Sequence, residues 1–255
     1  MPLTASKQPP PADGQAPRRR SGYTPPPDRH AYPFADLLLR IGRAALEDRQ
    51  MNFLRDASSG REATVFYAGE LDLLDAPTVS IVGTREVSDA GWKRASQLAR
   101  ELAKSGFTIV SGLAKGVDTA ALTSAISNGG RVAAVIGTPL DKAYPAENWE
   151  LQQQIYAHHL LMSPFKEGDR VFKSNFPVRN RLMAAVSDAT VIIEASDTSG
   201  TLHQAAECVS LGRWLFIAKS VVADTSLKWP KKFLGQPKVG VLSSPDEIVS
   251  AIGQP

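Results

Sequence analysis

Runs of apolar residues alternate with helix-like segments along most of this chain, and this alternation limits the fold more than any other feature does. The runs lack the alternation of polar and apolar residues that marks a strand with one solvated face, so we expect each to be a strand buried on both faces. Five of them are TVSIVGT (78–84), FTIVSG (107–112), RVAAVIGT (131–138), ATVIIEAS (189–196) and WLFIAKS (214–220).

The segments between these strands have the periodicity of amphipathic helices. In residues 88–106, five apolar side chains recur on one helical face, and Gly106 supplies a stop: they are Trp92, Ala95, Leu98, Ala99 and Leu102. Residues 116–130 and 201–212 are further helices, and a strand at 238–244 followed by a helix from Pro245 closes the chain. Buried strands that alternate with such helices indicate an α/β fold with a doubly wound, mostly parallel sheet and helices on both faces.

The two ends of the chain differ in composition. Residues 1–32 are rich in Pro and Arg, including Arg18, Arg19 and Arg20, and we expect a disordered tail there, solvated or touching an anionic partner. Residues 33–75 form a short helical lead-in followed by a first strand, and residues 76–255 form the main domain. A hydrophobic content of 43% over 255 residues is sufficient for a sizeable core.

Small-residue turns follow four of the expected strands, at the sheet edge where such folds bind ligands. Four turns at one edge favour an anion-binding site, although none matches G-x-G-x-x-G or G-x-x-x-x-G-K-[ST]. We therefore expect phosphate-binding turns at Gly83 and Thr84; at Ser111, Gly112 and Lys115; at Gly137 and Thr138; and at Ser199, Gly200 and Thr201.

Candidate catalytic groups are scarce, and we expect no catalytic residue, no metal site and no cofactor. Asp118 follows the second turn at the start of a helix, where a carboxylate stabilises the helix dipole or contacts a ligand. Cys208 is the only cysteine and is expected to be buried, which fits a reducing cytoplasm. No apolar run approaches the length of a membrane span. The net charge of +3 does not by itself indicate a nucleic-acid partner.

Residues 173–181 gather cations around one aromatic residue. Lys173, Arg179 and Arg181 surround Phe176, with Asn180 between the arginines. Cations of this kind can hold a phosphate backbone while the ring stacks on a base. An ordinary solvated loop before a helix has the same composition, so the stretch alone leaves both interpretations open.

Five motifs in this order and spacing resemble the DprA/Smf family of DNA-processing proteins. They are IVGTREVSDAG, SGLAKGVDTAAL, GTPLDKAYPAEN, FPVRNRLMAAVS and IIEASDTSGTLHQAA, and the similarity covers residues 64 to 220. The resemblance implies an extended Rossmann-like fold, binding of single-stranded DNA, a role in transformation by loading a RecA-type recombinase, and a homodimer. The chain departs from the family at Leu122, which replaces a histidine, and at IAKS, which replaces VPG. These departures leave a role in genome defence open.

The resemblance also assigns roles to single residues. Lys173, Arg179 and Arg85 match positions that the family uses to contact DNA phosphates, and Phe176 matches a base-stacking position. Arg181 matches too, either as a DNA contact or as an anchor to a buried carboxylate, with Asn180 holding the backbone.

Three further hypotheses remain open. Related Rossmann-like N-glycosidases carry a catalytic glutamate where this chain has Gln204, with Glu194 and Glu207 nearby in sequence. A sensor of a small nucleotide signal would use the same turns without chemistry. The basic stretch 228–238 is either an auxiliary path for a DNA strand or an exposed loop with aromatic residues packed against the sheet.

Overall fold

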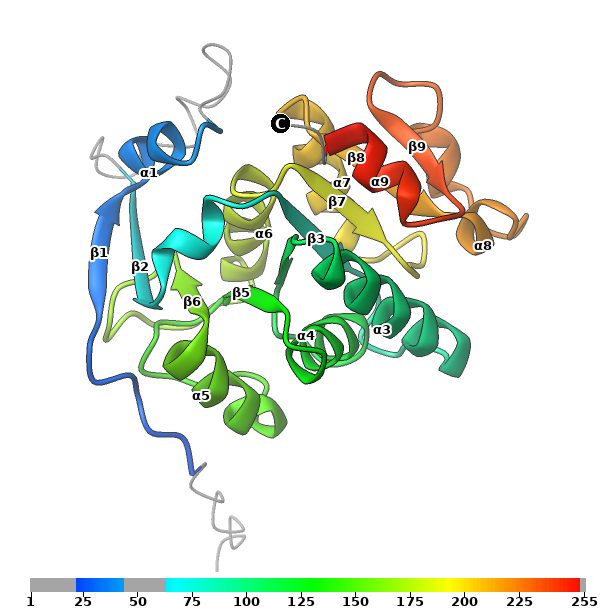
Figure 1. The fold of residues 1–255 in the computed structure, drawn as a ribbon. Helices are drawn as coiled ribbons and strands as arrows, with labels where there is room; N and C mark the ends of the chain where they lie inside the picture. The colour runs from blue at the N-terminus through cyan, green and yellow to red at the C-terminus, as the bar shows by residue number, and fades with distance from the viewer. Residues whose placement is uncertain (1–21, 44–62, 253–255) are drawn as a thin grey trace, which may run out of the picture.

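The structure is a computed structural model that describes residues 22–43 and 63–252. Nine strands form one sheet in this part of the chain, in the order β1-β2-β6-β5-β4-β3-β7-β8-β9 (Figure 1). Their bounds are β1 His30–Pro33, β2 Thr64–Gly69, β3 Thr78–Val82, β4 Thr108–Ser111, β5 Arg131–Val135, β6 Leu160–Ser163, β7 Ala189–Ile192, β8 Trp214–Ala218 and β9 Val239–Leu242.

The seven strands from β6 to β9 are parallel, whereas β1 and β2 add an antiparallel edge. The chain builds β3, β4, β5 and β6 outward in one direction and then returns to place β7 on the other side of β3. This change of direction between β3 and β7 is a topological switch point, where sheets of this kind bind their ligands. The expectation of a doubly wound, Rossmann-like sheet is confirmed.

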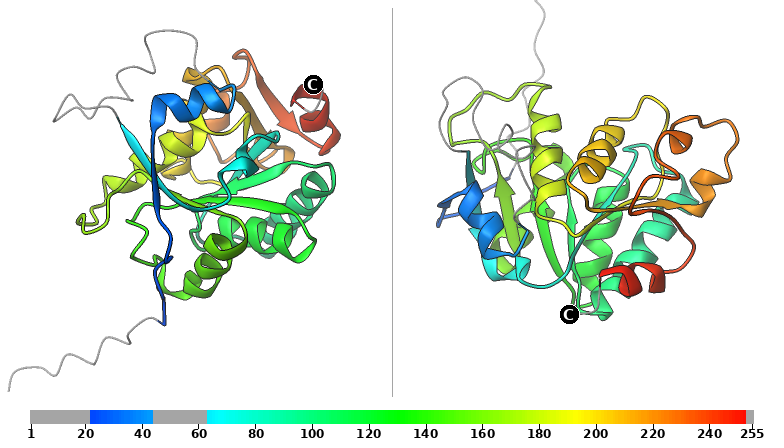
Figure 2. Two further views of the ribbon diagram at one scale, coloured as in Figure 1. Left: turned by 60° about the vertical axis from the view of Figure 1, so that its left-hand side comes forward. Right: turned by 90° about the horizontal axis from the view of Figure 1, so that it is seen from above.

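Helices cover both faces of the sheet (Figure 2). On one face lie α3 (Asp89–Lys104), α4 (Val117–Ser127), α5 (Trp149–His158) and α9 (Asp246–Ile252). On the other face lie α1 (Phe34–Arg40), α6 (Asn175–Ala185) and α7 (Thr201–Ser210), with α8 (Lys219–Val222) and the short 3-10 turns η1 (Leu71–Leu74) and η3 (Trp229–Lys232). A third 3-10 turn, η2 (Ala146–Asn148), precedes α5. Successive strand residues such as Ile81 and Val82 point into opposite cores, as the period of two requires.

The N-terminal segment differs from the expectation of a tail over residues 1–32. Residues 1–21 lie outside the described part of the chain, but residues 22–32 pack on the domain. The Tyr23 hydroxyl donates to the Leu140 carbonyl at 2.7 Å and accepts from Gln152. The next residues run along α5 and enter β1, which pairs with β2. Apolar contacts and hydrogen bonds therefore order a segment that its proline content made resemble a tail.

The lead-in is joined to the sheet by one partly buried ion pair. Arg43 follows α1 and donates to both carboxylate oxygens of Asp188, at 2.8 and 2.6 Å, and to the Leu74 and Ala76 carbonyls. Burial acts to raise the pKa of Asp188, but the hydrogen bonds from Arg43 and from the Thr78 amide hold that pKa below its ordinary value. Residues 44–62, which belong to the lead-in that we expected over residues 33–75, lie outside the described residues.

Three elements on the functional side were absent from the sequence-based expectation or differ from it. The sequence patterns did not lead us to expect α5 or β6. The stretch 173–181 is largely helical, because α6 begins at Asn175 with Pro177 in its first turn, where a missing N–H costs no hydrogen bond. In the described ranges, no helix combines the length and apolar character needed to cross a bilayer.

Candidate nucleic-acid interface

A cavity of about 320 Å³ lies beyond the carboxyl ends of β3 and β7, at the topological switch point. The turn after β3, the inner face of α6 and the start of α7 enclose it. Among the predicted site residues, the cavity is lined by Gly83, Thr84, Arg85, Phe176, Arg179, Asn180, Ser199, Gly200 and Thr201. Because Ala114 and Asp118 also line the cavity, the fold brings together residues from four of the five motifs.

Helical periodicity determines which residues of α6 reach this cavity. Phe176, Arg179, Asn180 and Met183 are spaced by three and four residues, so they share one face of the helix, and all four line the cavity. Arg181 lies off that face. Its side chain is exposed and its Nε donates to Glu207 on α7 at 2.9 Å.

The cation that meets a buried carboxylate is Arg179 and not Arg181. Arg179 is 6% exposed and Asp118 is 5% exposed, and Nη1 of the arginine lies 3.9 Å from Oδ2 of the aspartate. Burial raises the pKa of Asp118 against the opposing effect of Arg179, and burial lowers the pKa of Arg179 against that of Asp118. Arg179 also donates to the Val135 carbonyl at 3.2 Å. Because its guanidinium packs on the backbone of Gly112, a side chain at that position would collide with it.

Asp118 occupies the anion-binding position of the second turn. Its Oδ2 accepts from the Gly112 and Ala114 amides at 3.1 and 3.3 Å, so donors that we expected to face a phosphate hold an internal carboxylate instead. The sequence signal for Asp118 was its position after a glycine-rich turn, but its partner Arg179 is distant in sequence.

Hydrogen bonds inside the protein also engage the other turns. The Thr84 amide donates to the Glu194 carbonyl at 2.7 Å, and the Thr201 hydroxyl donates to the Gly83 carbonyl at 3.2 Å. The hydroxyls of Ser111 and Thr138 are buried and donate to the Ile81 and Lys142 carbonyls. These turns hold the shape of the site, and Ser111 and Thr138 do not line the cavity.

Arg85 is the exposed cation at the cavity mouth. Its guanidinium carbon lies 5.4 Å from the centroid of the Phe176 ring, a cation–π arrangement. Phe176 in turn packs on Gly137, where a Cβ atom would approach the ring to 2.9 Å. The ring that we expected to stack on a base is therefore already covered in part by Arg85.

Lys173 and Lys115 lie outside this first cavity. Lys173 precedes α6 and is exposed. Lys115 pairs with Glu147 at 2.6 Å on the surface.

The residues considered for an N-glycosidase are not arranged for that chemistry. Gln204 lines the cavity and is 1% exposed, whereas Glu194 and Glu207 do not line it. Glu194 accepts from the Ser88 hydroxyl at 2.8 Å, and Glu207 pairs with Arg181. In the described part of the chain, Gln204 Nε2 and Arg179 Nε are buried donors with no hydrogen-bond partner.

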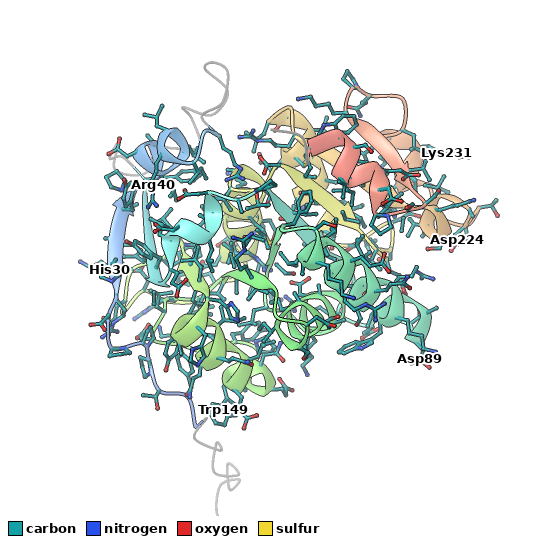
Figure 3. The ribbon with its side chains drawn as sticks, in the orientation of Figure 1. His30, Arg40, Asp89, Trp149, Asp224 and Lys231 are labelled. Atoms are coloured by element: carbon teal, nitrogen blue, oxygen red, sulfur yellow. The ribbon has the colours of Figure 1, made fainter. Side chains whose placement is uncertain are left out.

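The basic stretch 228–238 is a surface loop. Trp229 is fully buried and donates from its ring nitrogen to the Ala195 carbonyl at 3.0 Å, and Phe233 is buried beside it. The lysines remain exposed, and Figure 3 shows Lys231 on the far side of the molecule from His30. The aromatic residues therefore have no free face for a base.

A doubly wound sheet with a cavity at its switch point defines a Rossmann-like protein, a class in which that place is the usual ligand site. The sequence model of the family described as DNA recombination-mediator protein A matches residues 50–253. The chain belongs to this family, which the sequence motifs had indicated.

Relatives with solved structures agree with this assignment. DNA processing protein DprA from Streptococcus pneumoniae is 41% identical over 160 residues, which are 63% of this chain and 56% of that protein. Its X-ray structure superposes with a TM-score of 0.69 at 34% identity, over 81% of this chain and 71% of that one. DNA processing protein A from Helicobacter pylori, whose structure concerns its single-stranded DNA binding mode, gives a TM-score of 0.67 at 28% identity over 81% of this chain and 94% of that one. The chain spans about half the length of the curated relatives that it matches first.

Proposed function

We propose that this protein binds single-stranded DNA at the cavity beyond β3 and β7 and carries out no chemistry on it. The observation that carries this proposal is the exposed Arg85 guanidinium, held over Phe176 at the mouth of a cavity of about 320 Å³. That volume lies within the range of small-ligand sites and accommodates one nucleotide. The single-stranded DNA binding mode of the Helicobacter pylori relative supports the same ligand.

The contacts divide between phosphates and a base. Arg85 and Lys173 are both exposed cations, and they neutralise phosphates of the strand. The buried donors Arg179 Nε and Gln204 Nε2 lack hydrogen-bond partners in the described part of the chain, and both residues form the wall of the cavity. Phe176 supplies an aromatic wall, and Asn180 donates to the Gly200 carbonyl at 3.4 Å to hold α6 against the start of α7.

A concave site of this kind selects single strands. A base inside a duplex is paired and stacked, and it enters a cavity only after unpairing, which costs a few kcal/mol. A base in a single strand enters without that cost. The proposed contacts are made to phosphates and to the face of a base, and none depends on the hydrogen-bonding groups at a base edge. The binding therefore has little sequence specificity.

An N-glycosidase is disfavoured by the amide at Gln204, because an amide is neither a general base nor a negative charge that stabilises a cationic transition state. A nucleotide-signal sensor would use the same cavity without DNA. The proposed DNA-binding function and these two alternatives make different predictions for one paired assay.

The biological role that we propose is DNA processing in recombination and transformation, with protection of the strand and loading of a RecA-type recombinase by a homodimer. Membership of the recombination-mediator family supports this role. We place the protein in the cytoplasm, where its single buried cysteine, Cys208, needs no disulfide partner.

The test is a filter-binding titration with labelled oligonucleotide, run beside a nucleotide hydrolysis assay. We expect retention of the single strand, weak competition by free nucleotides, and no release of free base. Release of free base that is abolished by Glu194→Ala or Glu207→Ala would favour the N-glycosidase hypothesis. Binding of a free nucleotide without binding of DNA would favour the hypothesis of a nucleotide-signal sensor.

A further inference from the structure

A second cavity adjoins the first and shares a wall with it. Its volume is about 420 Å³, and Arg85, Phe176 and Arg179 line both cavities. On its other sides it is bounded by the turn at Lys115 and by Tyr144 with Pro145. The Arg85–Phe176 pair therefore stands as a partition between two spaces of nucleotide size.

Tyr144 presents an exposed aromatic ring beside this partition. Its ring centroid lies 5.5 Å from that of Phe176 at an interplanar angle of 50°, and the residue is 45% exposed. Phe176 is less exposed because Arg85 covers it and Gly137 packs against it. A base that stacks without displacing any side chain meets Tyr144 and not Phe176.

The turn that carries Tyr144 is held from several directions. The Lys142 carbonyl accepts from Thr138 and Gln152 at 3.0 and 3.1 Å, and the Lys142 ammonium donates to the Asp169 carbonyl at 2.7 Å. Tyr23 of the N-terminal segment donates to the Leu140 carbonyl in the same turn. An aromatic side chain on a fixed turn loses little conformational freedom on binding, which favours a role as a stacking platform.

We infer that the second cavity is a subsite for the nucleotide adjacent to the one in the first cavity, with its base stacked on Tyr144 and its phosphate near Lys115. This inference rests on the proposed binding of single-stranded DNA. The shared wall places the two nucleotides on either side of the Arg85–Phe176 pair, so one guanidinium lies close to the phosphate that joins them.

The test compares Tyr144→Ala and Tyr144→Phe by fluorescence anisotropy with a labelled 20-nucleotide oligothymidylate. Loss of one base stack weakens binding by about tenfold, whereas phenylalanine keeps the ring and the wild-type affinity. The salt dependence stays unchanged because no cation is removed. Phe172→Ala is the matched control, since Phe172 is 58% exposed and lines neither cavity; its affinity stays at the wild-type value.

A second ligand separates stacking from a structural effect. A strand of abasic deoxyribose phosphates offers no base, so wild-type protein and Tyr144→Ala bind it equally. Wild-type affinity of Tyr144→Ala for oligothymidylate, together with a loss in Arg85→Ala, would overturn the subsite and leave the proposed function in place. Wild-type affinity in both variants would overturn the proposed function itself. Equal losses in Tyr144→Ala and Phe172→Ala, or a loss of abasic-strand binding in Tyr144→Ala, would also overturn the subsite.

Discussion

Two arginines that both match phosphate-contacting positions of the family have opposite environments in this site. Arg85 is exposed at the cavity mouth, where its charge is available to a phosphate, whereas Arg179 is buried beside Asp118. Burial of one member of such a pair without the other leaves an uncompensated charge, which costs far more than a surface charge does. We therefore propose that Arg85 contacts the DNA and that Arg179 chiefly holds the wall between the two cavities in place.

Arg179→Met is expected to lower the free energy of unfolding by about 3–5 kcal/mol, because it leaves the Asp118 carboxylate buried and unpaired. Urea denaturation measures this change. Arg85→Ala, a surface substitution, is expected to change it by less than about 0.5 kcal/mol. The double variant Arg179→Met with Asp118→Asn should recover part of the loss, and a single variant as stable as the wild-type protein would contradict the structural role.

Gly137→Ala is expected to weaken DNA binding although it removes no contact group. The new Cβ atom would lie 2.9 Å from the Phe176 ring, so the ring and the Arg85 above it must shift. Overpacking of this kind costs about 1–3 kcal/mol of stability. Thermal melting and anisotropy titration measure the two effects. Gly200→Ala, whose Cβ would meet no atom within 4 Å, should melt close to the wild-type protein, and equal melting temperatures for all three proteins would refute the proposed packing.

At the scale of elements, the sequence predicts those helices and strands whose apolar residues recur with a clear period. The strands β3, β4, β5, β7 and β8 and the helix α3 were expected because their apolar patterns are long and regular. The strand β6 has only four residues and follows α5 with a single residue between them, so no turn signal separates the two. Pro177 made the start of α6 resemble a loop. Once that helix is known to begin at Asn175, its register places Arg179 inward and Arg181 outward, but the register depends on a boundary that local sequence does not define.

Side-chain contacts between elements that are distant in sequence were also not predictable from the sequence. The pairing of Asp118 with Arg179, the stacking of Arg85 on Phe176 and the packing of Tyr144 beside it join separate motifs. Each motif was recognisable alone, but the side chain that each one meets depends on the complete sheet.

The ion pair between Arg43 and Asp188 is expected to make the lead-in sensitive to acid. The pKa of Asp188 is lower in the folded protein than its ordinary value of about 3.9, so the stabilisation is complete above that pH. It is lost as the pH falls through the lower pKa of the folded state. Urea denaturation of wild-type protein and Asp188→Asn should therefore differ most at neutral pH and converge below about pH 4. A difference that stays constant down to pH 3 would contradict this expectation.

At the scale of the whole molecule, the part of the fold that braces the proposed DNA site differs from the part that forms the cavity. The N-terminal segment braces the turn that carries Tyr144 through the hydrogen bond from Tyr23 to the Leu140 carbonyl, while the switch point between β3 and β7 provides the first cavity. The basic loop at 228–238 lies apart, with its aromatic residues buried. The two adjoining cavities therefore form the path that we propose for one strand of DNA.

The proposed homodimer follows from the family and is tested in solution. Light scattering at high micromolar concentration is expected to give a mass of about twice the 27.4 kDa of one chain. A mass of one chain at that concentration would contradict the dimer while leaving the DNA site unaffected.

The most direct measurement of the central claim is an anisotropy titration of labelled single-stranded DNA over a series of salt concentrations, with blunt duplex as competitor. The wild-type protein is expected to prefer the single strand. Arg85→Ala should bind it more weakly and should flatten the log–log salt dependence by about 0.7, the value for one phosphate contact on a single strand. Equal or tighter binding of the blunt duplex, or an unchanged slope and affinity in Arg85→Ala, would contradict the account.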